Sequence, residues 1–374
     1  MAILKKILLV LCYSVFLTSI VVSIYINKVI INSHSQVPVQ SIAVNWETYE
    51  YGSEIEPALV IRWSHMPYHV VFWRNYIPIW IHNRDHVGFY FGWVEASPYE
   101  PLCDDNREFM TLTLVKQNRN NVKVEWTYNL TTFGGDIYHG DTQITEDYTF
   151  YANGLATREA TIIHGSDWQD GDRKKHGYEV CEWAVLNPAG TDPSQNVVPT
   201  GNVLEKIIDP WDSSRISYIY WDEGSDAITG SYSIIDYVNW DGQIHQIYSN
   251  ENDANPFVIF GKDSMPSANY YPDYIYSWTS TIRSCWHWPA KSDSYSKCSG
   301  SLSEIRAKNL PTHTMIVSYQ FDQQFETIDR IVGPFKWLIG MGNFGELDLR
   351  ELARTWLETG DVPVTIPTPP NGET

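Results

Sequence analysis

The sequence predicts an all-β protein, a large antiparallel β-sandwich with one C-terminal helix, preceded by an N-terminal transmembrane signal anchor. Three observations lead to this fold class. Short runs of β-branched and aromatic residues recur along the 374-residue chain between turn residues. Aromatic residues make up 14 % of the chain, which is typical of packed sheets or of surfaces that stack on sugar rings. One segment near the end has the period of a helix.

The N-terminal segment contains an almost unbroken apolar run from Ile7 to Ile26. At about 1.5 Å per residue, this run is long enough to cross a bilayer about 30 Å thick. Lys5 and Lys6 precede the run, which favours a cytoplasmic N-terminus, and no small-residue cleavage pattern follows closely. We therefore expect a single-pass, membrane-anchored protein with an extracytoplasmic body. A cleaved signal peptide and a buried core helix are the alternatives.

The chain divides into four parts. Residues 1–32 hold a short cytoplasmic stub and the anchor, and residues 33–50 are polar without a clear period, which suits a stalk. Residues 51–358 contain no fixed repeat and no long linker, so we expect one β-sandwich domain there. Residues 359–374 contain four prolines and indicate a loose tail.

Within the body, several predicted strands alternate apolar and polar residues, which places one face in a core. The clearest case runs from Val122 to Tyr128, and Asn153-Gly154 marks a tight hairpin turn. The absence of a sequence repeat favours a sandwich over a propeller. The predicted strands are 58–63, 69–73, 87–93, 109–115, 122–130, 148–151, 155–163, 178–186, 214–221, 244–248, 257–260, 314–319 and 335–339.

The predicted helix lies close to the C-terminus. Its apolar side chains recur at helical spacing, and Asp348 with Glu351 has the spacing of a capping box. The apolar positions are Leu349, Leu352, Ala353, Trp356 and Leu357. We expect this helix to pack on the sheet.

The formal net charge of the chain is −19. Residues 1–45 contain three lysines and no acidic residue, so the remainder carries −22. Such a charge disfavours nucleic acid as a partner. The chain also has no P-loop, no dinucleotide-binding fingerprint and no Gly-x-Ser-x-Gly motif, which disfavours nucleotide binding and serine-hydrolase chemistry.

Five cysteines are present, of which Cys12 lies in the apolar run. The other four, Cys103, Cys181, Cys285 and Cys298, are able to form up to two disulfides in an oxidising compartment. Cys285 with Cys298 is the attractive local pair because it closes a short loop. None has the CxxC spacing of a zinc ribbon.

Read in order, several short motifs resemble a family of secreted, mostly bacterial β-sandwich proteins associated with polysaccharide breakdown. The nearest analogy is to polysaccharide lyases of the ulvan-lyase kind. The match spans roughly residues 58–358. Its motifs are Val71-Phe72-Trp73-Arg74, Asp105 to Arg107, Glu146 to Tyr151 with Asn153-Gly154 and Arg158, His176-Gly177-Tyr178-Glu179, Leu186 to Thr191, Asn255-Pro256-Phe257, His287-Trp288-Pro289, Pro311-Thr312-His313, and Glu351 to Leu357.

The resemblance implies catalysis by β-elimination on an acidic, uronate-containing polysaccharide. Such chemistry needs a cation for the sugar carboxylate, a base for the C5 proton and an acid for the leaving O4. The candidate catalytic residues, each in a matched motif, are Arg107, His176, Tyr178 and His287. One departure stands out, since relatives have a His shortly after the matched Arg107 and this chain has Phe109, Met110 and Thr111.

Candidate substrate-binding residues gather in two places. The dense basic run Arg173, Lys174 and Lys175 offers a positive patch in an acidic body, although such runs are often solvated loops. Trp168, Trp286 and Trp288 are candidate stacking platforms, while the two that flank His287 also suit an aromatic core. His313 lies in a matched motif and is a further candidate.

The chemistry requires no cofactor, and no metal site is expected. Asp167, Asp170 and Asp172 are weak candidate ligands for a Ca²⁺ ion. The sequence thus favours an extracytoplasmic polysaccharide lyase whose partners are an acidic polysaccharide and, through the N-terminal helix, a membrane. A non-catalytic carbohydrate-binding protein on the same scaffold is the first alternative. A glycoside hydrolase is the second, with carboxylates such as Glu146, Asp147, Glu179 and Glu182.

Overall fold

The computed structural model describes the body of the chain in segments. The described residues are 41–51, 54–73, 77–96, 99–101, 104, 107–132, 135–165, 178–188, 203–220, 229–230, 240–247, 255–261, 312–321 and 331–363. The anchor expected within residues 1–32 lies outside them. Among the described residues, no helix is both long and apolar enough to span a membrane.

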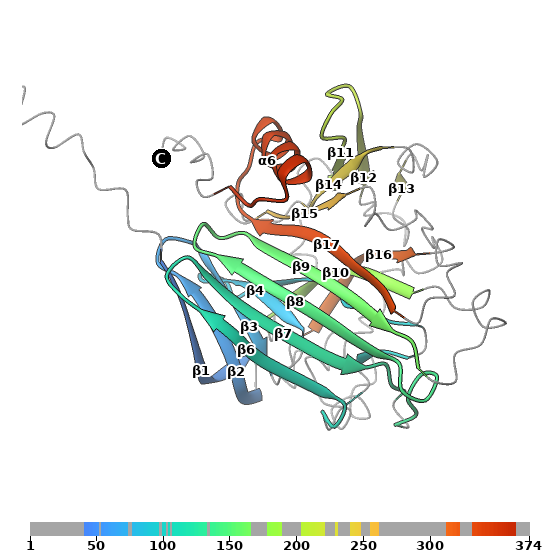
Figure 1. The fold of residues 1–374 in the computed structure, drawn as a ribbon. Helices are drawn as coiled ribbons and strands as arrows, with labels where there is room; N and C mark the ends of the chain where they lie inside the picture. Colours follow the sequence, from blue (N-terminus) through green and yellow to red (C-terminus); the bar gives the residue numbers. More distant parts are fainter. Residues whose placement is uncertain are drawn as a thin grey trace, which may run out of the picture. The chain divides into compact units, whose positions relative to one another are not determined.

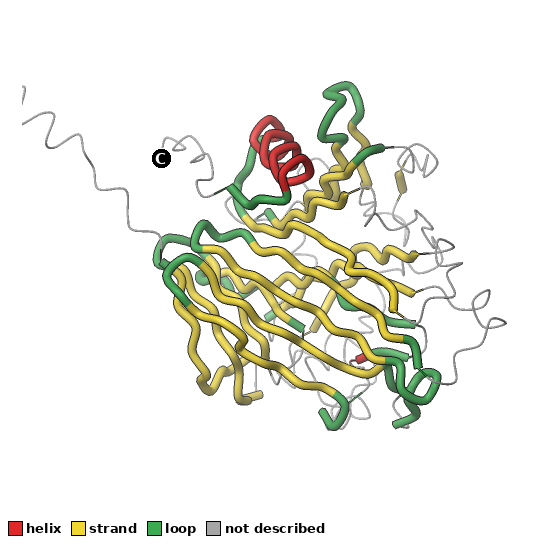
Figure 2. The backbone as a smooth tube through the Cα atoms, in the orientation of Figure 1, coloured by secondary structure: helices red, strands yellow, loops and turns green. Residues whose placement is uncertain are grey.

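Strands dominate the described residues, and one long helix follows the last strand (Figures 1 and 2). The all-β class and the C-terminal helix predicted from the sequence are thereby confirmed. The elements are β1 Ile42–Tyr51, β2 Glu54–Trp63, β3 Tyr68–Trp73, β4 Pro78–His82, β5 Gly88–Phe91, β6 Met110–Gln117, β7 Asn121–Asn129, β8 Gln143–Tyr151, β9 Ala156–Ile163, β10 Tyr178–Asn187, β11 Val203–Ile208, β12 Ile216–Tyr220, β13 Thr229–Gly230, β14 Gly242–Ile247, β15 Pro256–Gly261, β16 Thr312–Phe321, β17 Ile331–Met341 and α6 Glu346–Thr359.

The strands form two antiparallel sheets. The seven-stranded sheet has the order β1-β2-β3-β4-β5-β10-β16, and the ten-stranded sheet has the order β13-β12-β11-β14-β15-β17-β9-β8-β7-β6. Aromatic side chains of the smaller sheet pack on Phe150 of β8, with the ring centroids of Trp63, Phe72 and Trp80 5.8 to 6.3 Å away. The two sheets therefore share one aromatic core, as a sandwich requires.

The sequence and the structure differ at the start of the domain. Residues 42–50, expected to belong to the stalk, form most of β1, which pairs with β2 over its whole length. Ile42 and Val44 are buried on one face of this strand, whereas Trp46 on the same face is exposed. In the sequence, apolar residues stand at every second position only from Ile42 to Trp46 before Thr48 interrupts the pattern, so the period is too short to stand out.

The helix α6 covers part of the outer face of the ten-stranded sheet (Figure 1). Its Leu349, Leu352, Ala353 and Trp356 pack with Ile208, Ile244, Ile259 and Leu338 of the sheet. The helix starts earlier than the predicted capping box implies. Gly345 is the N-cap, and its backbone N–H donates to Asp348 Oδ2 at 3.3 Å, so Asp348 is the reaching-back carboxylate rather than the cap.

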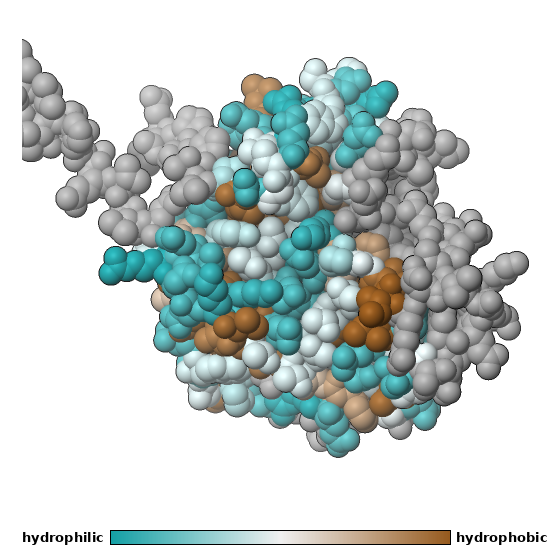
Figure 3. Space-filling model, in the orientation of Figure 1, coloured by the Kyte–Doolittle hydropathy of each residue, from teal (hydrophilic) through white to brown (hydrophobic). Residues whose placement is uncertain are grey.

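The rest of that outer face is polar. Along β7 and β8 every second residue is buried, and the intervening positions carry mainly charged, threonine and other polar side chains. Figure 3 shows this face as mostly hydrophilic with small hydrophobic patches. Lys123 with Asp147 and Lys336 with Glu159 form ion pairs across it at 3.1 and 3.0 Å.

The inner face of the same sheet holds a buried ion pair. Arg158 and Glu146 are 1 % and 0 % exposed, and the Arg158 Nε lies 2.6 Å from Glu146 Oε2. Tyr128 and Tyr148 donate their hydroxyl protons to the same carboxylate. The Arg158 guanidinium also stacks on Trp337 at 4.5 Å and donates to the Phe91 carbonyl in the other sheet. Burial alone would lower the pKa of Arg158, but the Glu146 carboxylate outweighs it and the net direction is upward.

We expect Arg158→Met to destabilise the protein by about 3 to 5 kcal/mol, because it leaves the Glu146 charge buried without its counter-ion. The double variant Arg158→Met, Glu146→Gln removes both charges, and we expect it to lose less unfolding free energy than Arg158→Met alone. Urea unfolding measures both free energies. The control is Lys336→Met, which breaks an exposed pair and costs no more than about 1 kcal/mol. Equal losses for the single and double variants would contradict this account of the core.

Candidate active site

Most of the residues proposed from the sequence lie outside the described residues. These are Trp168, Arg173, Lys174, Lys175, His176, Trp286, His287 and Trp288, the calcium candidates Asp167, Asp170 and Asp172, and Cys12, Cys103, Cys285 and Cys298. His313 belongs to β16, where its backbone pairs with Leu186 of β10. Cys181 belongs to β10. Arg107 and Tyr178 are the catalytic candidates whose side chains the structure describes.

Tyr178 is the first residue of β10 and meets a histidine that the sequence reasoning missed. Its hydroxyl lies 2.9 Å from the Nδ1 of His164, the residue that directly follows β9. The two rings are tilted, with centroids 5.6 Å apart. Burial raises the pKa of Tyr178 well above its usual value, and the neighbouring Tyr138 adds to the rise. The phenol is therefore protonated at neutral pH, and the raised pKa also makes it a weaker acid than an ordinary tyrosine.

The loop between β7 and β8 packs against the Tyr178–His164 pair. Tyr138 meets Tyr178 edge to face at 6.2 Å and lies beside His139, whose backbone is left-handed at φ 46°. Gly165 fits against the backbone of His139 where a Cβ would collide, and its N–H donates to Thr142 Oγ1 at 3.0 Å. Close backbone contact thus fixes the position at which β9 ends.

Arg107 lies just before β6. Its backbone is left-handed at φ 60°, in a turn where Asp104 accepts the N–H groups of Glu108 and Phe109. Its Nη1 is 4.0 Å from Glu56 Oε2, so the guanidinium already has an acidic neighbour. Met110, one of the three residues that stand in place of the His expected from the motif resemblance, is buried in the core.

A second polar cluster lies on the inner face of β11 and β14. His245 Nδ1 is 2.7 Å from Glu205 Oε1, and its Nε2 is 2.9 Å from Gln243 Oε1. All three side chains are buried, and Phe260 meets the imidazole edge to face. The histidine and the carboxylate are residue types that form acid–base pairs in enzymes, with the carboxylate orienting the imidazole. In the sequence, only the alternation of Gln243 and His245 in a short apolar strand indicates it.

The carboxylates considered for a glycoside hydrolase are partly accounted for. Glu146 is fully buried and neutralised by Arg158, so it has no access to a sugar. Asp147 lies on the opposite face of β8, 3.1 Å from Lys123. Among the described residues, no three His, Cys, Asp or Glu side chains are grouped to hold a metal ion.

Comparisons with known proteins add little. No family model and no curated protein matches the chain. Among solved structures, galactose 1-epimerase from Lactobacillus acidophilus NCFM aligns over 80 % of this chain and 98 % of its own, with 8 % identity and a TM-score of 0.29. That similarity is too low to support an argument about function.

We expect stability to fall as the pH rises above about 10, because Tyr178 ionises in the unfolded chain but stays protonated in the fold. Below that pH its contribution is fully present. In Tyr178→Phe the fall is less steep, by up to about 1.4 kcal/mol per pH unit, and stability at neutral pH drops by about 1 kcal/mol. Urea unfolding at a series of alkaline pH values gives the slopes. Identical slopes for the two proteins would show that Tyr178 is not buried as described.

Proposed function

We propose that the protein is an extracytoplasmic polysaccharide lyase that cleaves an acidic polysaccharide by β-elimination. The observation that supports it most is the hydrogen bond between Tyr178 and His164. It links a buried phenol that carries its proton to an imidazole, and these are two groups that act as acid and base when a proton is transferred to a sugar oxygen. The motif resemblance, which includes Tyr178 and His176, supports the same chemistry.

The order of residues along the chain adds to this support. His164 and Tyr178, whose side chains are hydrogen-bonded, flank residues 165–177 in the sequence. That segment contains Trp168 and the basic run Arg173, Lys174, Lys175 and His176. Any site at Tyr178 therefore has cations for a uronate carboxylate and a second histidine within a few residues along the chain.

In the proposed reaction, His176 takes the proton from C5 of the uronate, and the basic run stabilises the charge that develops on the carboxylate. A double bond forms between C4 and C5 while the bond from C4 to O4 breaks. Tyr178 gives its proton to the departing O4, and His164 returns a proton to Tyr178. His287 is the alternative base, and Arg107 is an alternative cation.

The test uses purified protein, either with its N-terminal 40 residues replaced by a soluble tag or as the full chain in detergent. This protein is incubated with ulvan, alginate, pectin and glycosaminoglycans. We expect unsaturated sugar ends, detected by their ultraviolet absorbance, on at least one polymer. Tyr178→Phe lowers kcat by about 10²- to 10⁴-fold. Lys174→Ala with Lys175→Ala mainly raises KM, whereas the control Lys123→Ala, on the outer face, changes neither.

The lyase proposal fails if the wild-type protein forms no unsaturated ends on any uronate polymer. Stability is measured first for each variant, because Tyr178→Phe also removes a buried hydrogen bond. Release of reducing ends without the absorbance change would instead indicate a glycoside hydrolase.

One observation favours a second candidate function. Tyr178 and His164 are each only 2 % exposed, which is also what a structural hydrogen bond would show. On that interpretation the protein binds carbohydrate without cleaving it. Binding on a glycan array that survives His176→Ala and His287→Ala, together with no turnover, would favour the binding protein over the enzyme.

A further inference from the structure

A groove on the outer face of the ten-stranded sheet lies apart from the Tyr178–His164 pair. It has a volume of about 600 Å³ and lies beside the C-terminal end of α6, over β9 and β17. This volume is within the range of small-molecule sites. Its walls combine the aromatic residues Trp211, Trp356 and Tyr151 with the charged residues Glu159, Asp241 and Lys336.

Trp211 is the side chain that marks this groove as a binding surface. It is 42 % exposed, whereas most tryptophans with described side chains are buried. Its backbone N–H donates to Asp209 Oδ1 at 2.8 Å, and Asp212 N–H donates to the same oxygen at 3.2 Å. Ser214 closes the turn by donating its N–H and its hydroxyl to Asp212 Oδ1. The turn therefore holds a large indole in water at a defined place.

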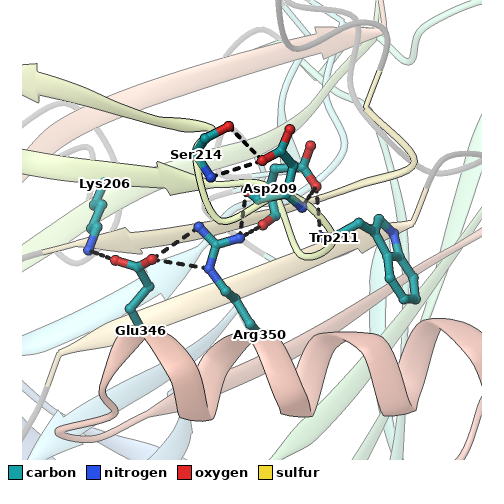
Figure 4. A network of polar contacts seen from close by, with 7 residues as sticks. Lys206, Asp209, Trp211, Ser214, Glu346 and Arg350 are labelled. Carbon is teal, nitrogen blue, oxygen red and sulfur yellow. Dashed lines mark hydrogen bonds and ion pairs between the residues drawn. The ribbon is translucent and has the colours of Figure 1, made fainter.

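The helix α6 contacts this turn through the side chain of Arg350. Arg350 is buried and donates to the backbone carbonyls of Asp209 and Asp212, and Glu346 holds the guanidinium at 3.0 Å (Figure 4). Lys206 of β11 donates to the other oxygen of Glu346 at 2.6 Å. The network anchors the turn to both the helix and the sheet. The indole of Trp211 lines the groove together with Tyr151 and Trp356, and a concave surface with several aromatic side chains is typical of a ligand site.

The charges of the groove indicate the class of ligand. Lys336 and Glu159 form an ion pair at 3.0 Å, and Asp241 adds a negative charge to a body that is already acidic. An anionic polymer would be repelled there, whereas sugar hydroxyls can donate to carboxylates and accept from an ammonium group. An exposed indole matches the apolar face of a pyranose ring.

We propose that this groove is a binding site for a short segment of an uncharged hexopyranose chain, which stacks on Trp211. The site does not depend on the proposed lyase activity. It would hold a neutral stretch of polysaccharide on the outer face of the sheet, whereas the Tyr178–His164 pair is buried between the two sheets.

The test is calorimetric titration of the protein with the tetrasaccharides of cellulose, mannan, laminarin and agarose, and with tetragalacturonate as the charged comparison. We expect at least one neutral tetrasaccharide to bind. Trp211→Ala weakens that binding at least about tenfold, and Trp211→Phe, which keeps a ring face, restores part of it. The matched control is Trp46→Ala, which removes another exposed indole, 52 % exposed, on β1 and leaves the affinity unchanged.

Three results would overturn the proposal. They are no binding of any neutral tetrasaccharide, equal weakening by Trp46→Ala and Trp211→Ala, or tighter binding of tetragalacturonate that Trp211→Ala abolishes. Tetragalacturonate cleavage is assayed separately, so failure of the groove and failure of the lyase give different results.

Discussion

Glu146 and Arg158 bring opposite charges into the dry layer between the two sheets, where an isolated charge would cost several kcal/mol. Each charge is therefore surrounded by partners: two tyrosine hydroxyls on the carboxylate, and an indole face and a carbonyl of the opposite sheet on the guanidinium. The Tyr128 hydroxyl also accepts a hydrogen bond from the backbone N–H of Val94. The pair thus joins β8 to β9, and Arg158 joins both strands to Phe91, the last residue of β5 in the opposite sheet.

The same pair determines where the candidate active site lies. Because side chains alternate along a strand, burial of Arg158 places Ala160, Ile162 and His164 on the same inner face. A slip of one residue between β8 and β9 would expose Arg158 and turn His164 away from Tyr178. The hydrogen bond between Tyr178 and His164 at the end of β9 therefore depends on an ion pair six residues earlier in the strand.

The local parts of this structure could be predicted from the sequence. Alternation placed β7 and β9 to within a residue or two, and helical spacing placed α6. What could not be predicted depends on contacts distant in sequence. Tyr178 was identified as a candidate, but its partner His164 was not. Nothing in the linear pattern indicates that the end of β9 lies beside the start of β10. Trp211 was missed for a related reason, since its place depends on Arg350, more than a hundred residues away.

The position of β17 in the ten-stranded sheet has a consequence for how the chain assembles. This strand is the last in the sequence, yet it lies between β15 and β9 and pairs with both. Until β17 has been synthesised, β9 and β15 each lack one neighbour. The strands β6 to β9 and the strands β11 to β15 are then two separate groups, each with an unpaired edge. Exposed strand edges invite pairing with other chains. The ten-stranded sheet therefore closes only when β17 is available, and until then the edges of β9 and β15 are open to pairing with other chains.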